Sequence, residues 1–311
     1  MKVSTCVDRY VAYRQSLGIG FCGEKGLLHA FARFVGDVEL RSVTPQVVRR
    51  YLDGDGPVTN YWLAKYHALT GFYRFAISRK YVSASPLPRD KPRRQWSFIP
   101  YIYSVAEMKS LLEATGKRYR NCWLLSPATI RTLLLLLYGS GLRISEASAL
   151  NVDDVDLRAR ILTVRQTKFY KSRLAPIGTD LCDLLGAYQR KHRIGAISDD
   201  QPFLTDRTGR RIAKQTAQHS YKLLREQAGI RRPAGVFFQP RLHDLRHTFA
   251  VNRLISWYRA GKNAQQLLPH LATYLGHCSI RETQVYLQLT SDLAQEASSR
   301  FRRYALPMAG Q

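Results

Sequence analysis

The chain has 311 residues, which is long enough for two domains, and 45% of them are hydrophobic, which excludes wholesale disorder. Lys and Arg number 48 against 23 Asp and Glu, so the formal net charge is +25. An excess of this size does not help folding and is typical of proteins that bind a polyanion, so nucleic acid is the expected partner. A merely basic, soluble surface is the alternative.

The cysteines and the apolar segments indicate the cellular compartment in which the protein is expected. The five cysteines are scattered and form no C-x-x-C pair, which argues against a disulfide framework or a zinc cluster and fits a reducing cytoplasm. The opening MKVSTCVDRYVAYRQ lacks the apolar core of a signal peptide, and the most apolar stretch, residues 130–141, is too short to span a bilayer. We therefore expect a cytoplasmic, nucleoid-associated bacterial protein with no membrane partner.

Residues 1–83 are predicted to form a helical domain. Three short amphipathic helices come first, over residues 8–17, 24–35 and 45–52. Thr44 followed by Pro45 is typical of a helix start. A longer helix is predicted from about Thr59 to Lys80, with an apolar stripe that indicates a packed core. Four cations lie off that stripe and are candidate DNA contacts: Lys65, Arg74, Arg79 and Lys80.

Residues 84–100 are predicted to form a basic, proline-rich linker. Prolines in extended backbone make a semi-rigid strap, and the cations among them suit it to lie along DNA. Arg93 and Arg94 are the candidate DNA contacts of this segment. Two basic domains on a basic strap suggest a clamp around a duplex, and an ordinary interdomain linker is the alternative.

Residues 101–311 are predicted to form a second domain, mostly helical with one small antiparallel sheet. Ser104 and Glu107 form a capping-box pattern before the first helix. A strongly apolar helix is predicted from Ile130 to Tyr138, and another begins near Ile144 after a glycine break. Two strands, over residues 161–166 and 173–177, are predicted on either side of a turn at 168–172, and helices dominate from Ala213 onward.

The first two of four reactive islands are G-L-R-I-S-E and the predicted turn. Arg143 follows a glycine at a helix start, where its guanidinium can reach a phosphate, and Glu146 one turn later could hold it in place. Such an Arg–Glu pair alone is usually a surface salt bridge. On the turn, Lys168 or Lys171 could protonate a leaving oxygen, although either is alternatively a solvated turn lysine.

The third island is RLHDLRHTFAVNRL, in which His243 and Arg246 share one helix face. His243 and His247 are four residues apart and resemble the zinc pattern H-E-x-x-H. Here the acid is the shorter Asp244, and Arg246 would put a cation beside the metal, so zinc is the less favoured alternative and no metal is expected.

The fourth island is LATYLGHCSIRETQVYLQL. His277 follows a glycine, and Tyr286 comes nine residues later. Tyr274 and Tyr286 are both possible nucleophiles by chemistry, although a tyrosine in an apolar helical run is normally part of the core.

Read in order, G-L-R-x-S-E, a hairpin lysine, H-x-x-R-H, L-G-H and a tyrosine nine residues on resemble the signature of the tyrosine recombinases, the phage integrase family. The resemblance covers about residues 100–305, and the N-terminal helices resemble the family's SAM-like core-binding domain. It implies supporting Glu146 and six catalytic residues, with Tyr286 as the nucleophile: Arg143, Lys168, His243, Arg246, His277 and Tyr286. Lys171 is the alternative to Lys168.

The resemblance also implies a mechanism. Two arginines and His277 would hold the phosphate while Tyr286 attacks, leaving a 3′-phosphotyrosyl link and a free 5′-hydroxyl, without cofactor. An unperturbed phenol has a pKa of about 10, so forming phenolate at pH 7 costs about 4 kcal/mol, and nearby cations lower that cost. His243 is the expected proton acceptor, and Lys168 the expected donor to the departing oxygen.

The family further suggests that a C-terminal helix, with an apolar stripe over residues 293–304, docks on a neighbouring protomer. A homotetramer on paired double-stranded DNA sites would then exchange strands through a Holliday junction, in the service of a mobile element. We expect no separate arm-site reader ahead of the helical domain. The alternatives are a type IB topoisomerase, which would share this chemistry, and a non-catalytic architectural DNA-binding protein.

Overall fold

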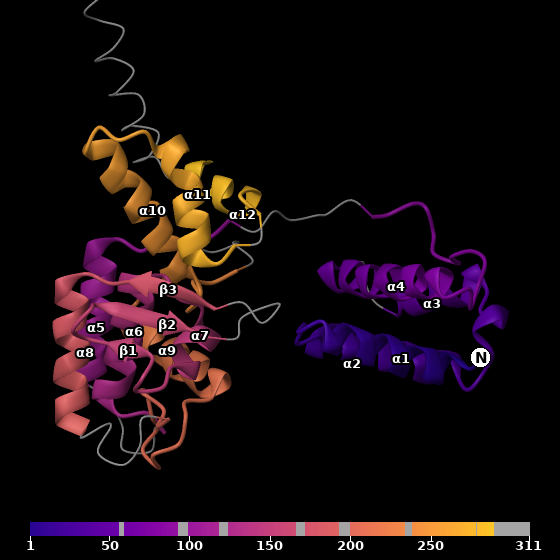
Figure 1. The fold of residues 1–311 in the computed structure, drawn as a ribbon, viewed down its shortest axis with the longest axis horizontal. Helices are drawn as coiled ribbons and strands as arrows, with labels where there is room; N and C mark the ends of the chain where they lie inside the picture. Colours follow the sequence, from indigo (N-terminus) through magenta and orange to yellow (C-terminus); the bar gives the residue numbers. More distant parts are fainter. Residues whose placement is uncertain are drawn as a thin grey trace, which may run out of the picture. The chain divides into compact units, whose positions relative to one another are not determined.

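The computed structural model describes residues 1–55, 59–92, 99–117, 124–165, 172–192, 200–233, 238–277 and 279–288. The chain divides into two compact units, one ending by residue 97 and the other beginning at residue 98 (Figure 1). Each unit is mostly helical, and the second carries one small sheet, which confirms the predicted fold class. Within the described residues, no helix combines the length and apolarity needed to cross a membrane.

Four helices and a short 3-10 turn build the first unit: α1 (Val3–Ser16), α2 (Cys22–Val35), η1 (Leu40–Ser42), α3 (Pro45–Asp53) and α4 (Asn60–Ser78). Thr44 and Thr59 accept backbone hydrogen bonds at the starts of α3 and α4, so both predicted starts are confirmed. The first helix begins at Val3 and not at residue 8, because its buried face already includes Val3 and Cys6.

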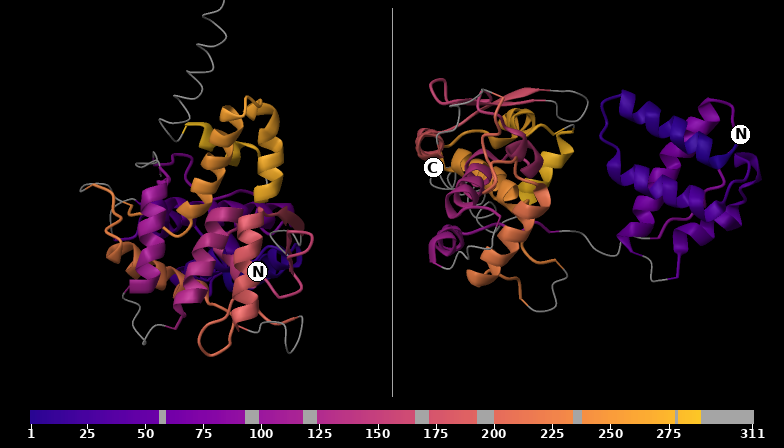
Figure 2. Two further views of the ribbon diagram at one scale, coloured as in Figure 1. Left: turned by 90° about the vertical axis from the view of Figure 1, so that its left-hand side faces the viewer. Right: turned by 90° about the horizontal axis from the view of Figure 1, so that it is seen from below.

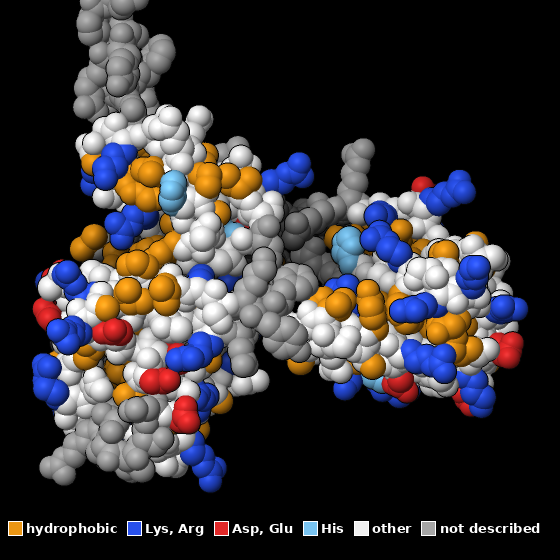
Figure 3. Space-filling view, in the orientation of Figure 1, with side chains coloured by type: hydrophobic (Ala, Val, Ile, Leu, Met, Phe, Trp, Pro, Cys, Tyr) orange, Lys and Arg blue, Asp and Glu red, His pale blue; other side chains and the backbone are white. Residues whose placement is uncertain are grey.

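The core of the first unit lies between α4 and the other helices. Trp62, Tyr66, Leu69, Tyr73 and Ala76 of the predicted stripe are all buried, which confirms that this stripe packs inside and does not stack on bases. The surface is basic. Figure 3 shows Lys and Arg side chains spread over this unit, with few Asp and Glu among them.

The second unit begins with five helices and a sheet. The helices are α5 (Val105–Lys117), α6 (Pro127–Ser140), α7 (Ile144–Ala149), α8 (Thr179–His192) and α9 (Lys214–Gln227). The strands are β1 (Val155–Asp156), β2 (Ile161–Val164) and β3 (Arg173–Pro176), antiparallel in the order β1-β2-β3. The predicted capping box at Ser104 and Glu107 is present, and β1 is one strand more than predicted because two residues show no periodicity.

The remaining elements carry most of the third and fourth islands: α10 (Asp244–Arg259), α11 (Ala264–Leu275), α12 (Arg281–Gln284) and η3 (Val285–Gln288). They pack around a separate apolar cluster that includes Phe249, Leu268 and Leu275. The two long helices, α10 and α11, lie side by side (Figure 1 and Figure 2).

Helix α10 also packs against α6, which sets the position of the first island. Helix α6 ends at Gly141, which has a φ of +63° that L side chains rarely adopt. A Cβ at this position would lie 2.4 Å from Phe249 Cδ1, so only glycine permits the close approach of α10. The end of α6 is thereby held against the helix that carries Arg246.

Candidate active site

The first island folds into the start of α7. Arg143 is the residue before the helix, and Glu146 accepts from its backbone N–H (2.9 Å) and from its guanidinium Nη1 (2.8 Å). The guanidinium also donates from Nη2 to Gly276 O at 3.0 Å. A third of the Arg143 side chain (33%) stays exposed, so it can still reach a ligand. The contact expected between Glu146 and Arg143 is present.

Arg246 lies on α10 and is almost fully buried in the site. Its side chain is 2% exposed and donates to Gly141 O (2.8 Å) and to Leu275 O (2.6 Å). Burial and the neighbouring Arg143 lower its pKa to about 10. Since a buried cation needs partners, the two carbonyls explain why Arg246 tolerates this position.

A third arginine belongs to this site, and sequence reasoning missed it. Arg173, at the start of β3, donates to both carboxylate oxygens of Glu146 (3.1 and 2.8 Å) and to Tyr274 O (2.8 Å). In the sequence it is one of two basic residues in KSRLAP, and strand periodicity does not indicate what its side chain contacts. Its partners lie 27 and 101 residues away along the chain.

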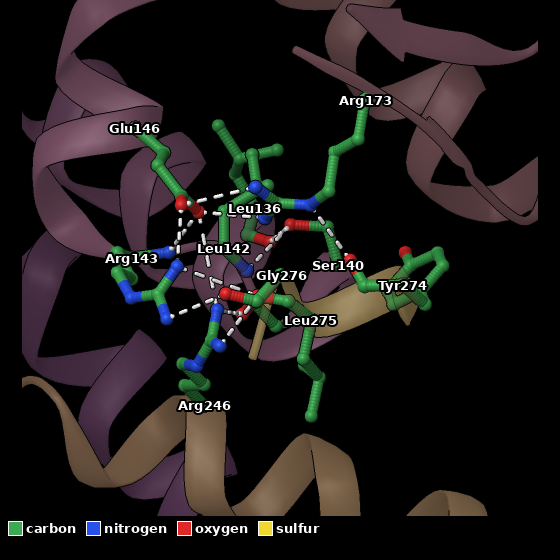
Figure 4. A network of polar contacts seen from close by, with 11 residues as sticks. Leu136, Ser140, Leu142, Arg143, Glu146, Arg173, Arg246, Tyr274, Leu275 and Gly276 are labelled. Atoms are coloured by element: carbon green, nitrogen blue, oxygen red, sulfur yellow. Dashed lines mark hydrogen bonds and ion pairs between the residues drawn. The ribbon is translucent and has the colours of Figure 1, made fainter. Parts of the chain in front are cut away.

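Figure 4 shows the three guanidiniums converging on Glu146 and on the carbonyls that end α11. Burial raises the pKa of Glu146, but hydrogen bonds from Arg173 and Arg143 outweigh burial and lower that pKa to about 2. Glu146 is therefore ionised, and it balances only one of the three positive charges. The carbonyls at a helix C-terminus add partial negative charge, yet the site stays cationic and suits an anion.

Tyr286 lies in η3 with its hydroxyl at this cationic cluster. The side chain is buried, and its Oη is 3.0 Å from His247 Nδ1. Burial raises the pKa of Tyr286, whereas the charges of Arg246 and Arg143 lower it. Tyr286 is thus buried as a core tyrosine would be, but its hydroxyl contacts His247 and is near enough to Arg246 and Arg143 for their charges to act on it.

Tyr274, the other candidate nucleophile, is arranged differently. Its hydroxyl donates to Pro176 O at 3.1 Å, and its ring stacks on Phe249 at 5.5 Å. Burial raises its pKa to about 12. These contacts give Tyr274 a packing role on β3, and the structure favours Tyr286 as the nucleophile.

His277 follows the left-handed Gly276 that ends α11. Its Nδ1 is 2.7 Å from Oγ1 of the buried Thr283, a partner that sequence reasoning did not identify. The ring lies beside Tyr286, with centroids 6.2 Å apart. Burial and the charges of Arg246 and the other arginines lower the pKa of His277 to about 3, so it is neutral.

The third island contributes both of its histidines. His243 is exposed, and partial burial together with the nearby Arg246 lowers its pKa to about 4. His247 lies further inside, with its ring 4.9 Å from that of His243, and burial lowers its pKa to about 3. Sequence reasoning considered His247 only as a zinc ligand. Among the residues that the structure describes, no group of three His, Cys, Asp or Glu could hold a metal ion.

Other predicted residues are not assembled here. Lys168, Lys171, Arg93 and Arg94 lie outside the described residues. In the first unit, the Lys65 ammonium donates to Tyr51 O (2.7 Å), so this side chain stabilises the packing of the helices. Arg74, Arg79 and Lys80 are exposed.

The chain belongs to the phage integrase family, the tyrosine recombinases. The family model, described as "Phage integrase family", matches residues 104–292, more than half of the chain. The chain is 34% identical over 307 residues to the putative integrase/recombinase y4rB of Sinorhizobium fredii (strain NBRC 101917 / NGR234). The matched region covers 96% of each protein. The predicted family and its class of reaction are confirmed.

Two solved structures share the fold. The Tn1549 transposon integrase in complex with transposon right end DNA has a TM-score of 0.69 at 17% identity, over 98% of this chain and 100% of that one. A lambda integrase tetramer bound to a Holliday junction has a TM-score of 0.64 at 16% identity, over 92% of this chain and 77% of that one.

Proposed function

We propose that the protein is a site-specific recombinase that cuts and rejoins double-stranded DNA through a 3′-phosphotyrosyl link to Tyr286, in the service of a mobile element. The observation that carries this proposal is the buried Tyr286 hydroxyl, which lies 3.0 Å from His247 Nδ1 and whose pKa the charges of Arg246 and Arg143 lower. Relatives named integrase/recombinase support it.

The arginines supply the phosphate site. Phosphoryl transfer builds negative charge on the non-bridging oxygens, and catalysis depends mainly on positioning and electrostatics. Arg143 and Arg246 would clamp those oxygens, with His277 donating a further hydrogen bond. Because the hydrogen bonds of Glu146 and the α11 carbonyls already hold the guanidiniums, little reorganisation is needed when DNA arrives.

The reaction has one nucleophile and one leaving oxygen. Tyr286 Oη attacks phosphorus, the bond from phosphorus to the 5′ oxygen breaks, and Lys168 is proposed to protonate that oxygen. The phosphotyrosyl link keeps the phosphodiester energy, so rejoining needs neither ATP nor a cofactor. The assignment of His243 as the proton acceptor stays a prediction, and its exposed position also suits it to contact the phosphate.

We assign DNA binding to both units. Residues 1–83 would form the core-binding domain, residues 84–100 the strap with Arg93 and Arg94, and residues 101–311 the catalytic domain. Arg74, Arg79 and Lys80 are exposed and basic, as phosphate contacts must be.

We propose that the active assembly is a homotetramer on paired DNA sites, linked through the C-terminal helix, in the bacterial cytoplasm at the nucleoid. The lambda integrase tetramer on a Holliday junction is a precedent from the same fold. Residues 293–304, which would form the exchanged helix, lie outside the described residues.

A nicked suicide substrate tests the chemistry, because loss of the short strand after cleavage traps the covalent enzyme. The wild-type protein should form an adduct that denaturing electrophoresis detects, and Tyr286→Phe should form none. A wild-type protein that binds the site but never forms the adduct would indicate an architectural protein. Paired sites then separate a recombinase, which yields exchanged products, from a topoisomerase, which only relaxes supercoils.

A further inference from the structure

The hydroxyl of Tyr286 has two polar neighbours with opposite hydrogen-bonding abilities. Arg246 carries only donors, and its charge acts on the phenol oxygen and lowers the pKa of Tyr286. The phenol proton is then free to point elsewhere, and His247 Nδ1 lies 3.0 Å away. The hydroxyl can therefore donate to His247 while Arg246 stabilises the oxygen that becomes charged.

The position and the neutral state of His247 both suit it to accept a proton. It lies one turn along α10 from His243, with only 15% of its side chain exposed, so bulk water has little access. Burial and the adjacent His243 lower its pKa, which keeps the imidazole neutral at neutral pH. With the ring proton on Nε2, which faces Asp244, Nδ1 is an acceptor. A general base must lie within hydrogen-bonding distance of the proton that it removes, and this distance meets that requirement.

We propose that His247 is the general base that takes the proton from Tyr286. This inference rests on the proposed function. As the bond from Tyr286 Oη to phosphorus forms, the Oη–H bond breaks and the proton passes to His247 Nδ1. The bond from phosphorus to the 5′ oxygen breaks at the same time, and the proton returns when the DNA is rejoined.

The carboxylate of Asp244, near the second ring nitrogen of His247, would balance the positive charge that the ring gains on protonation. Nε2 of His247 is 3.9 Å from Oδ1 of the buried Asp244. That carboxylate accepts from the Arg241 backbone N–H (2.8 Å) and guanidinium (3.2 Å), which hold it at the start of α10. A carboxylate beyond the second ring nitrogen stabilises an imidazolium, as in other nucleophile–histidine–acid arrangements.

The geometry divides the work between the two histidines. His247 contacts the nucleophile, whereas His243 is exposed and lies beside Arg246 and Arg143, where the phosphate would bind. In this proposal His247 replaces His243 as the proton acceptor from Tyr286, and His243 contacts substrate.

Two substitutions separate proton transfer from positioning. The amide oxygen of His247→Asn can accept the Tyr286 hydrogen bond in place of Nδ1 but cannot hold a proton, whereas His247→Ala removes both functions. Single-turnover cleavage of the nicked substrate should fall by roughly 10²-fold or more in both variants, with DNA affinity unchanged. The matched control is His270→Asn, an exposed histidine on α11, which should cleave at the wild-type rate.

The leaving group provides a second test. A substrate with sulfur in place of the 5′ bridging oxygen has a leaving group that needs no proton. It should restore cleavage by Lys168→Ala but not by His247→Asn. Restoration of His247→Asn by this substrate, or wild-type cleavage of the normal substrate by His247→Asn, would overturn the inference. Neither outcome touches the proposed function, which fails only if the wild-type protein forms no adduct through Tyr286.

Discussion

Arg173 and Glu146 form a bidentate contact: the guanidinium Nη1 and Nη2 donate to the two carboxylate oxygens, at 3.1 and 2.8 Å. The same carboxylate holds Arg143, so β3 supports a proposed phosphate-binding arginine through one intermediate residue. Arg173 therefore acts as a positioning residue at this site.

Substitution of Arg173 by lysine should lower the cleavage rate more than DNA affinity. Lysine keeps the charge but cannot bond both oxygens of Glu146 or the Tyr274 carbonyl as a planar fork does. We expect a decrease of at least about tenfold in suicide-substrate cleavage. Arg173→Ala should in addition destabilise the fold by about 3–5 kcal/mol, measured by urea unfolding, because it breaks a buried ion pair. Full activity of both variants would remove Arg173 from the site.

Gly276 should not tolerate alanine. Its φ is +67°, and an added Cβ would lie 2.8 Å from Arg173 Nη1. Gly261 is a matched control, because its φ is +70° and an added Cβ would meet nothing within 4 Å. Both alanine variants should lose about 1 kcal/mol of stability from the strained backbone. Only Gly276→Ala should also lose cleavage activity, since it displaces Arg173 and the carbonyl that holds Arg143. Equal activity of the two variants would contradict this.

Thr283 should orient His277. Thr283→Val keeps the shape of the buried side chain and removes the 2.7 Å hydrogen bond to Nδ1, so the ring can turn away from the phosphate. Cleavage should fall by about tenfold while DNA binding persists, because second partners of catalytic histidines typically contribute this much. Thr115→Val is the control, since Thr115 is also buried and its hydroxyl donates to Leu112 O in its own helix. Equal cleavage rates for the two variants would show that Thr283 is only packed there.

The buried histidines should make the fold sensitive to mild acid. Burial lowers the pKa of His247 and of His277 to about 3, below the value of about 6.5 in an unfolded chain. The unfolded state therefore binds more protons below pH 6.5, and stability falls as pH drops from 6.5 towards 3. Each histidine should cost up to about 2 kcal/mol between pH 7 and pH 5.

Urea unfolding at pH 7 and pH 5 measures this effect. The loss of stability should be smaller in His247→Asn and in His277→Asn than in the wild-type protein, since asparagine does not titrate. His270→Asn should lose as much as the wild type, because it changes an exposed residue and leaves both buried rings in place. Equal losses in all four proteins would show that the two rings titrate normally.

The cations of the first unit should separate into two kinds. Arg74 is exposed, so Arg74→Ala should weaken DNA binding uniformly across sequences and reduce the slope of log K against log salt by about 1. Lys65 donates to Tyr51 O and lies 4.6 Å from the Tyr51 ring, so Lys65→Ala should lower thermal stability and leave that slope unchanged. A reduced slope for Lys65→Ala would return it to the DNA-binding set.

Local sequence patterns predicted several helix starts, the buried face of α4 and the family. The starts of α3, α4 and α5 follow from Thr44, Thr59 and Ser104, since a cap satisfies backbone groups within three residues of itself. The buried stripe of α4 follows from its helical period. The order of the motifs was enough to indicate the family, because each motif is short and contiguous.

Tertiary structure alone decided the chemistry between these motifs. It gave Tyr274 a packing contact, brought Arg173 to Glu146 and placed His247 against Tyr286, the last two across separations of 27 and 39 residues. A sequence period reports which face of a helix or strand is buried, but not which distant side chain that face meets. That partner depends on how α6, α10, α11 and β3 pack together, and packing is a property of the whole fold.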